Sequence, residues 1–101
     1  ALWDLVGKYL NEPVYRLLGY DKTYPKLPYA SVLFGDTPDA TRTIARSLKD
    51  KGYSAAKFGW GPMGKVSLEN DVALVAAARD GLGTHPELMV DCGVVWGATL
   101  G

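Results

Sequence analysis

Short apolar runs of strand length alternate with amphipathic stretches of helical length through most of this chain. Turn residues such as glycine and proline separate the two kinds of segment. Alternation of this kind predicts parallel strands joined by right-handed helical crossovers, which is the α/β class of fold. The expected strands are residues 29–34, 53–58 and 87–91, and the expected helices between them are residues 38–51 and 68–82.

The two crossover helices have recognisable ends. Thr37 stands before a proline, so its hydroxyl can cap free backbone N–H groups while proline takes the first helical position. This helix stops before Gly52, which suits a left-handed C-terminal cap. Ser67 is the expected cap of the second helix, and Gly81 and Gly83 are expected to close it. These caps therefore predict where each of the two crossover helices begins and ends.

Two shorter helical patterns precede the alternating part. Residues 2–10 place apolar side chains near one side of a 3.6-residue period, which is typical of an amphipathic helix. Residues 14–18 form a second short helical pattern that ends at Gly19. Residues 19–28 contain glycine and prolines and predict a loop.

The predicted sheet is too small to be closed. Its strands are apolar along their length, which indicates that both faces are covered. The chain begins at Ala1, already inside a helical pattern, and stops at Gly101 just after a strand-to-turn signal. We therefore expect part of a larger α/β domain. A small, complete and open α/β domain is the alternative.

The charge balance argues against several classes of partner. The chain has 11 basic and 11 acidic residues, so it offers no electrostatic case for nucleic acid or an anionic membrane.

No apolar stretch approaches the length that spans a bilayer, and no signal-peptide pattern opens the chain. The lone Cys92 cannot form an internal disulfide, which favours a reducing compartment, and we expect a cytoplasmic protein.

Charged residues stand where two of the predicted strands end. Asp91 terminates the apolar run 88–91 before a glycine-containing turn, and Lys57 stands near the end of the run 53–59. The carboxyl ends of parallel strands share one edge of the sheet, where active sites are built. A carboxylate there is well placed to hold a divalent cation or to touch substrate. The pattern predicts part of a metal-assisted active site.

The loop 59–65 also matches two phosphate-binding patterns, G-x-G-x-x-G and G-x-x-x-x-G-K. Against this interpretation, Val66 follows Lys65 where a metal-binding Ser or Thr is needed, and Pro62 lacks an N–H group. We favour a loop beside the active site, with Trp60 and Met63 near the substrate. A phosphate- or nucleotide-binding α/β module remains the alternative of another class.

Several segments together resemble one enzyme family. Residues 1–8 and 13–19 resemble the stretch that enters the catalytic barrel in the mandelate racemase/muconate lactonizing group of the enolase superfamily. Residues 52–59 resemble that family's second barrel strand, and residues 88–93 resemble its third. The resemblance implies a partial (β/α)8 TIM-type barrel with the order β-α-β-α-β. It also implies a division into a helical linker from the capping domain, residues 1–27, and the N-terminal part of the catalytic barrel, residues 28–101.

The same resemblance implies a chemistry. Family members bind Mg²⁺ and begin by abstracting the proton next to a carboxylate. Asp91 matches the first of three metal-binding carboxylates, and Lys57 matches the first Lys of a Lys-x-Lys motif, as base or electrostatic helper. Gly59 stands in place of the second Lys, and Gly93 stands where relatives often carry Asn. The remaining ligands and the opposing base are absent from this chain.

The resemblance therefore implies a lyase that dehydrates a small sugar acid, with racemisation or epimerisation of a hydroxy acid or amino acid derivative as the nearest alternative. It implies a homo-oligomeric full-length protein, whereas the isolated chain should be inactive and bind Mg²⁺ weakly. Trp60 should flank the substrate, and Ser31 could hydrogen-bond it or stay buried among the strands. Trp96 could line the pocket or the core. His85 should be an exposed loop residue at the opposite end of the strands, and Cys92 a small core residue.

Overall fold

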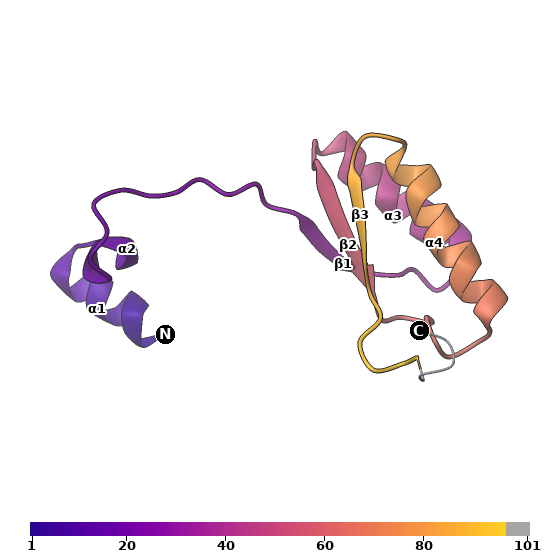
Figure 1. Cartoon of the computed structure of the whole chain (residues 1–101), viewed down its shortest axis with the longest axis horizontal. Helices are drawn as coiled ribbons and strands as arrows, with labels where there is room; N and C mark the ends of the chain where they lie inside the picture. The colour runs from indigo at the N-terminus through magenta and orange to yellow at the C-terminus, as the bar shows by residue number, and fades with distance from the viewer. Residues whose placement is uncertain (97–101) are drawn as a thin grey trace.

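The computed structural model describes residues 1–96 and contains a three-stranded parallel sheet with two long helices on one of its faces (Figure 1). The last five residues of the predicted segment 28–101 lie outside the described part. The elements are, in chain order, α1 (Leu2–Leu10), α2 (Val14–Leu17), β1 (Ala30–Leu33), α3 (Pro38–Asp50), β2 (Ala55–Gly59), α4 (Leu68–Leu82) and β3 (Glu87–Asp91). The predicted β-α-β-α-β order is confirmed.

The strand register decides which side chains share a face. The strands lie in the order β1-β2-β3, and Ser31 pairs with Lys57, which pairs in turn with Met89. Successive residues of a strand point to opposite faces. One face therefore presents positions 31, 33, 55, 57, 59, 87, 89 and 91, and the other presents positions 30, 32, 56, 58, 88 and 90.

The hydrophobic core lies between the second of these faces and the two long helices. Phe58 is fully buried at its centre and packs against Phe34, with ring centroids 5.4 Å apart. The helices contribute small and aliphatic side chains that let them lie close to each other and to the sheet. The buried apolar residues from the helices are Ala45, Leu48, Leu74, Ala77, Ala78 and Leu82.

The expectation that both faces of the sheet are covered is not met within residues 1–96. Both α3 and α4 lie on one side of the sheet (Figure 1). On the open side, the Leu33 side chain is 61% exposed and Ser31 is also exposed. The apolar character of the strands was therefore a correct sign of burial for one face only, because no described residues cover the other.

The predicted helix caps are largely confirmed. The Thr37 hydroxyl accepts from the Ala40 N–H at 3.2 Å, and the Ser67 hydroxyl accepts from the Asn70 N–H at 3.1 Å. Gly52 has φ 82°, the left-handed conformation expected at the end of α3. The predicted strand 53–58 begins two residues later in the structure, because the Tyr53 N–H still bonds to the Leu48 carbonyl of α3 at 3.2 Å.

The prediction that Gly81 closes the second helix is wrong. Gly81 is a buried residue inside α4, and the helix continues to Leu82 before Gly83 caps it. A Cβ on Gly81 would lie 2.5 Å from the Arg42 carbonyl oxygen and 2.6 Å from the Ala45 Cβ. Gly81 therefore permits the close approach of α3 to α4.

Gly81→Ala is expected to destabilise the full-length protein, although alanine is the better helix former. Alanine gains about 1 kcal/mol of helix propensity, but overpacking a tight contact costs about 1–3 kcal/mol. The exposed Ala76 on the same helix supplies the control, because Ala76→Gly should cost only about 1 kcal/mol from propensity. Chemical denaturation measures both. A Gly81→Ala protein more stable than the unsubstituted one would contradict the close contact.

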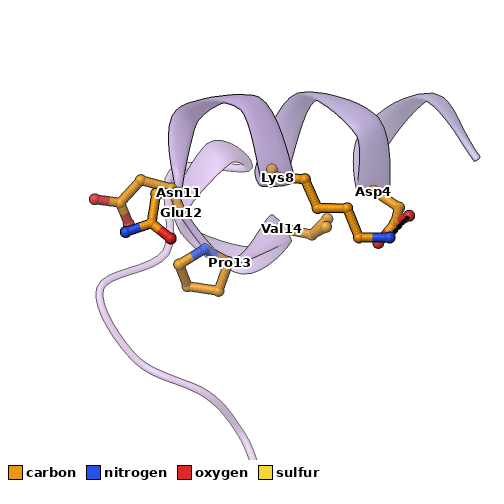
Figure 2. Close-up of a pocket in the computed structure, with 7 residues that line it drawn as sticks. Asp4, Lys8, Asn11, Glu12, Pro13 and Val14 are labelled. Atoms are coloured by element: carbon orange, nitrogen blue, oxygen red, sulfur yellow. Dashed lines mark hydrogen bonds and ion pairs between the residues drawn. The ribbon is translucent and has the colours of Figure 1, made fainter.

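The N-terminal helices pack against each other and stand apart from the sheet, joined to it by an extended segment (Figure 1). Gly7 is buried at their contact, where a Cβ would lie 2.8 Å from the Glu12 carbonyl oxygen. A hollow of about 380 Å³ lies beside this contact, and on its rim Lys8 pairs with Asp4 at 2.9 Å (Figure 2). The apolar side of α1 is exposed. The division into residues 1–27 and 28–101 stays a prediction.

Within residues 1–96, no helix is both long enough and apolar enough to cross a membrane.

Candidate functional site

A lysine from β2 and an aspartate from β3 meet at the carboxyl end of the sheet. The Lys57 ammonium donates a hydrogen bond to the Asp91 carboxylate, with Nζ and Oδ2 3.1 Å apart. The second carboxylate oxygen, Oδ1, accepts from the Gly93 N–H at 3.1 Å. Asp91 lies beside Gly59 in the register, two positions beyond the level of Lys57, so the long lysine side chain leans along the sheet to reach it.

This contact shifts the pKa values of both groups in the direction that keeps them charged. The hydrogen bond to Asp91 raises the pKa of Lys57, with a smaller contribution from Tyr29. The hydrogen bond from Lys57, followed by the one from the Gly93 N–H, lowers the pKa of Asp91. At neutral pH the site therefore holds an ammonium and a carboxylate. In this arrangement Lys57 carries positive charge and does not accept a proton.

The Lys57–Asp91 ion pair should stabilise the folded protein over a range of pH that is bounded by the pKa values of the two groups. The folded pKa of Asp91 lies below its ordinary value of 3.8, so its contribution is present above that value and is lost as pH falls through the lowered pKa. The contribution of Lys57 is lost only as pH rises through a pKa above 10.5. Lys57→Gln should therefore lower the melting temperature at pH about 7, and the difference from the unsubstituted protein should shrink in acid.

Melting of the full-length protein between pH about 3 and 7 measures this difference. Lys51→Gln provides the control, because Lys51 is an exposed lysine at the end of α3. A difference between Lys57→Gln and the unsubstituted protein that stays constant down to the lowest pH would contradict the ion pair.

Tyr29 is a neighbour of the site that the sequence analysis missed. The Lys57 Nζ lies 5.8 Å from the centre of the Tyr29 ring, within the range of cation–π attraction. Tyr29 immediately precedes β1 and is two positions before Ser31, the register partner of Lys57. Strand alternation from Ser31 could have placed it on the same face.

All four predicted site residues line one cavity of about 180 Å³ at the carboxyl end of the strands. The cavity lies on the open face of the sheet and combines apolar and charged walls. Its lining residues are Ser31, Val32, Leu33, Lys57, Gly59, Trp60 and Asp91. The structure thus brings together the residues that the sequence singled out, whereas their chemical roles stay predictions.

The prediction that Met63 lies near the substrate is wrong. Met63 belongs to the β2–α4 loop, but it is fully buried in the core and does not line the cavity. Its backbone N–H bonds to the Trp60 carbonyl at 3.2 Å, so the chain turns inward directly after Trp60. Trp60 itself stays 48% exposed beside the cavity.

The loop 59–65 does not form a phosphate cradle. The Gly64 N–H points at both oxygens of the Asp71 carboxylate, 3.0 Å from each, where an anion would be repelled. The Lys65 N–H bonds to the Pro62 carbonyl, and the Lys65 Nζ bonds to the Gly61 carbonyl at 2.8 Å. The N–H groups of Gly64 and Lys65 and the Lys65 ammonium are therefore already engaged, by Asp71 of α4 and by carbonyl groups of the loop.

Asp71 is a second residue that the sequence analysis undervalued. It is 4% exposed and accepts hydrogen bonds from the Gly64 N–H and from the Trp96 Nε1 at 2.9 Å. It thereby connects α4 with the loops that follow β2 and β3. Trp96 accordingly packs against the core, which settles the alternative left open for it.

The two other residues considered from sequence lie outside this cavity. His85 is exposed in the loop before β3, at the opposite end of the strands, as predicted. Cys92 directly follows Asp91 and is half-buried with a free thiol, so it is less enclosed than a core residue.

The residues at the rim fit one part of a magnesium site. Mg²⁺ prefers carboxylate oxygens, and each Asp91 oxygen accepts one hydrogen bond and keeps further lone-pair capacity. Its side chain is 38% exposed and reachable from the cavity. Among residues 1–96, no three His, Cys, Asp or Glu side chains gather in a way that could hold a metal. Asp91 could therefore be only one ligand of several.

Comparison with known proteins identifies this parallel α/β unit as part of a barrel. Residues 39–99 match the family described as "Enolase C-terminal domain-like". The chain belongs to this family, in the mandelate racemase/muconate lactonizing group of the enolase superfamily. The β-α-β-α-β unit is accordingly part of the enolase C-terminal barrel domain.

Curated relatives include both lyases and racemases. A D-gluconate/D-galactonate dehydratase of Picrophilus torridus is 34% identical over 99 residues, covering 91% of this chain and 25% of the relative. An N-succinyl-L-Arg/Lys racemase of Bacillus cereus is 31% identical over 96 residues, covering 95% of this chain and 25% of the relative. The chain thus spans about a quarter of the length of the curated relatives it matches.

Solved structures show the same similarity. The crystal structure of a predicted mandelate racemase from Rhodobacter sphaeroides is 49% identical with a TM-score of 0.77, covering 96% of this chain and 25% of that one. That of D-glucarate dehydratase from Agrobacterium tumefaciens, complexed with magnesium, is 32% identical with a TM-score of 0.72, covering 91% of this chain and 26% of that one.

Proposed function

We propose that this chain supplies the first part of the active site of a Mg²⁺-dependent lyase that dehydrates a sugar acid. The observation that carries the proposal is the Lys57–Asp91 pair at the carboxyl end of adjacent parallel strands, in a chain of the enolase superfamily. The dehydratase relative and the magnesium-bound dehydratase structure support the choice of reaction and metal.

The proposed reaction has two bond-breaking events. The C–H bond next to the substrate carboxylate breaks and its proton passes to a base. The released electron pair forms a C=C bond to the β-carbon as the β C–O bond breaks, and the departing hydroxyl takes a proton from an acid to leave as water. Such a carbon acid is too weak for a side-chain base unless the developing negative charge is stabilised. When bound, Mg²⁺ would supply positive charge beside the substrate carboxylate.

The side chains of this chain take distinct parts in the proposal. Asp91 contributes one metal ligand. Lys57, held as an ammonium, adds positive charge at the cavity and faces the substrate carboxylate. Trp60 flanks the substrate, and the exposed Ser31 offers a hydroxyl for a hydrogen bond. Gly59 has no side chain that could act as a base, so the base is either Lys57 after loss of its proton or a residue outside this chain.

Racemisation or epimerisation is the second candidate, since it begins with the same proton abstraction and a racemase is among the relatives. The full-length enzyme should be incubated with a panel of hydroxy acids in D₂O, with and without EDTA. Loss of water, with solvent deuterium on the former β-carbon of the product, supports dehydration. Exchange with inversion and no loss of water supports the racemase. Turnover that persists in EDTA would contradict both.

The expected homo-oligomer stays a prediction, which light scattering of the full-length protein would check.

A further inference from the structure

Trp60 adopts a backbone conformation that few large residues adopt. Its φ is 55°, in the left-handed region, and within residues 1–96 the only other non-glycine residue with positive φ is Asn11. A strained conformation persists only where the surrounding structure enforces it, and such residues cluster at functional sites. The strain places the indole ring at the end of β2, beside the cavity that contains Asp91.

The ring lies directly against the turn that follows Asp91. A Cβ on Gly93 would lie 3.1 Å from both Cη2 and Cζ2 of Trp60. Gly93 has φ 55° and donates its N–H to Asp91 Oδ1 at 3.1 Å. Two reasons therefore require glycine at position 93, its positive φ and the presence of the Trp60 ring.

A second glycine, Gly59 on the neighbouring strand, lies close against the backbone of Asp91. A Cβ on Gly59 would lie 2.7 Å from the Asp91 carbonyl oxygen and 3.0 Å from the Asp91 Cβ. The Asp91 backbone is thus held between the bare main chain of Gly59 and the turn at Gly93. The Trp60 ring covers that turn from outside. The two departures from the family pattern, at positions 59 and 93, consequently belong to one packing arrangement.

We propose that Trp60 is a positioning residue for Asp91. Its ring holds the Gly93 turn in place, and the turn directs the Asp91 carboxylate toward Lys57 and the cavity. The consequence for metal binding rests on the proposed function, whereas the consequence for the Lys57–Asp91 contact does not.

The test measures the pH profile of Lys57 in the full-length protein with EDTA present. Trace acetylation across a pH series, read by mass spectrometry, gives the midpoint at which the Lys57 amine becomes reactive. Asp91→Asn sets the largest expected downward shift of this midpoint, because it removes the negative charge of the acceptor whose hydrogen bond raises the Lys57 pKa. A substitution that only exposes Lys57 to the reagent changes the plateau rate of acetylation but not its midpoint. The measurement therefore separates a change in access from a change in the Lys57 pKa.

Trp60→Ala should move the midpoint down by about half or more of the shift that Asp91→Asn causes, because the carboxylate loses its orientation. Trp60→Phe should lower the midpoint by less than Trp60→Ala does, since a phenyl ring keeps part of the cover although it lacks the Cη2 and Cζ2 atoms that face Gly93. Trp3→Ala, a truncation of the half-exposed tryptophan on α1, should change nothing. An unchanged midpoint in Trp60→Ala, or an equal shift in Trp60→Phe, would overturn the proposal even if the melting temperature fell.

Calorimetry with Mg²⁺ alone extends the test to the metal. Groups that orient a ligand typically contribute about 10–100-fold to metal affinity, so the Kd of Trp60→Ala should rise by about 10-fold or more. Trp60→Phe should stay within about 3-fold. If the unsubstituted protein bound no Mg²⁺, the proposed function would fail, and the Lys57 profile would still decide the role of Trp60.

Discussion

Asp91→Asn in the full-length protein is expected to weaken Mg²⁺ binding by at least about 100-fold and to remove metal-dependent turnover. Mutations of groups that merely orient a metal ligand cost about 10–100-fold in affinity, and loss of the ligand itself should cost more. The substitution keeps the size of the side chain but removes its negative charge. It also leaves the Lys57 ammonium without its carboxylate partner, 3.1 Å away in the structure. Calorimetry with Mg²⁺ and turnover assays measure the two effects.

The matched control is Asp50→Asn, which removes one negative charge from the exposed end of α3. It should leave the Mg²⁺ Kd unchanged, which separates ligation from a general loss of charge. Tight Mg²⁺ binding by Asp91→Asn would show that the metal is held without this carboxylate.

Phe58→Ala is expected to lower the free energy of unfolding by about 3–5 kcal/mol. Phe58 is fully buried in the middle of β2 and contacts Phe34 across the core, so truncation removes apolar burial and leaves a cavity that the neighbouring strands cannot fill. The same strand carries Lys57, so the site should loosen as well. Urea denaturation of the full-length protein measures the loss.

Val66→Ala serves as the comparison, because Val66 is exposed in the loop before α4. Its cost should stay within about 0.5 kcal/mol. A Phe58→Ala protein as stable as the Val66→Ala protein would place Phe58 outside the core and contradict the register of β2.

Local chemistry explains why much of this fold could be predicted from the sequence. Thr37 and Ser67 cap helices through contacts with residues only three positions away. Lys57 and Asp91 meet because each stands near the carboxyl end of a parallel strand, and parallel strands align those ends. These inferences needed the order of the elements but no detailed packing.

Packing between distant segments explains what could not be predicted. The role of Gly81 depends on Arg42 and Ala45 of a different helix, and neither contact leaves a local signature. Met63 belongs to the loop beside the site, but the turn after Trp60 places its side chain in the core. Similarly, the environment of Asp71 requires knowing that residues 64 and 96 converge on it.

Adjacent strands deliver an ammonium and a carboxylate to one cavity, and we propose that a divalent cation assists the chemistry there. A crystal structure of the full-length protein grown with Mn²⁺ in place of Mg²⁺ tests it most directly, because anomalous scattering locates the ion. We predict an ion bonded to the Asp91 carboxylate, with the Lys57 ammonium facing the same cavity. An ion bound elsewhere, or an Asp91 side chain turned away from an occupied metal site, would contradict the account.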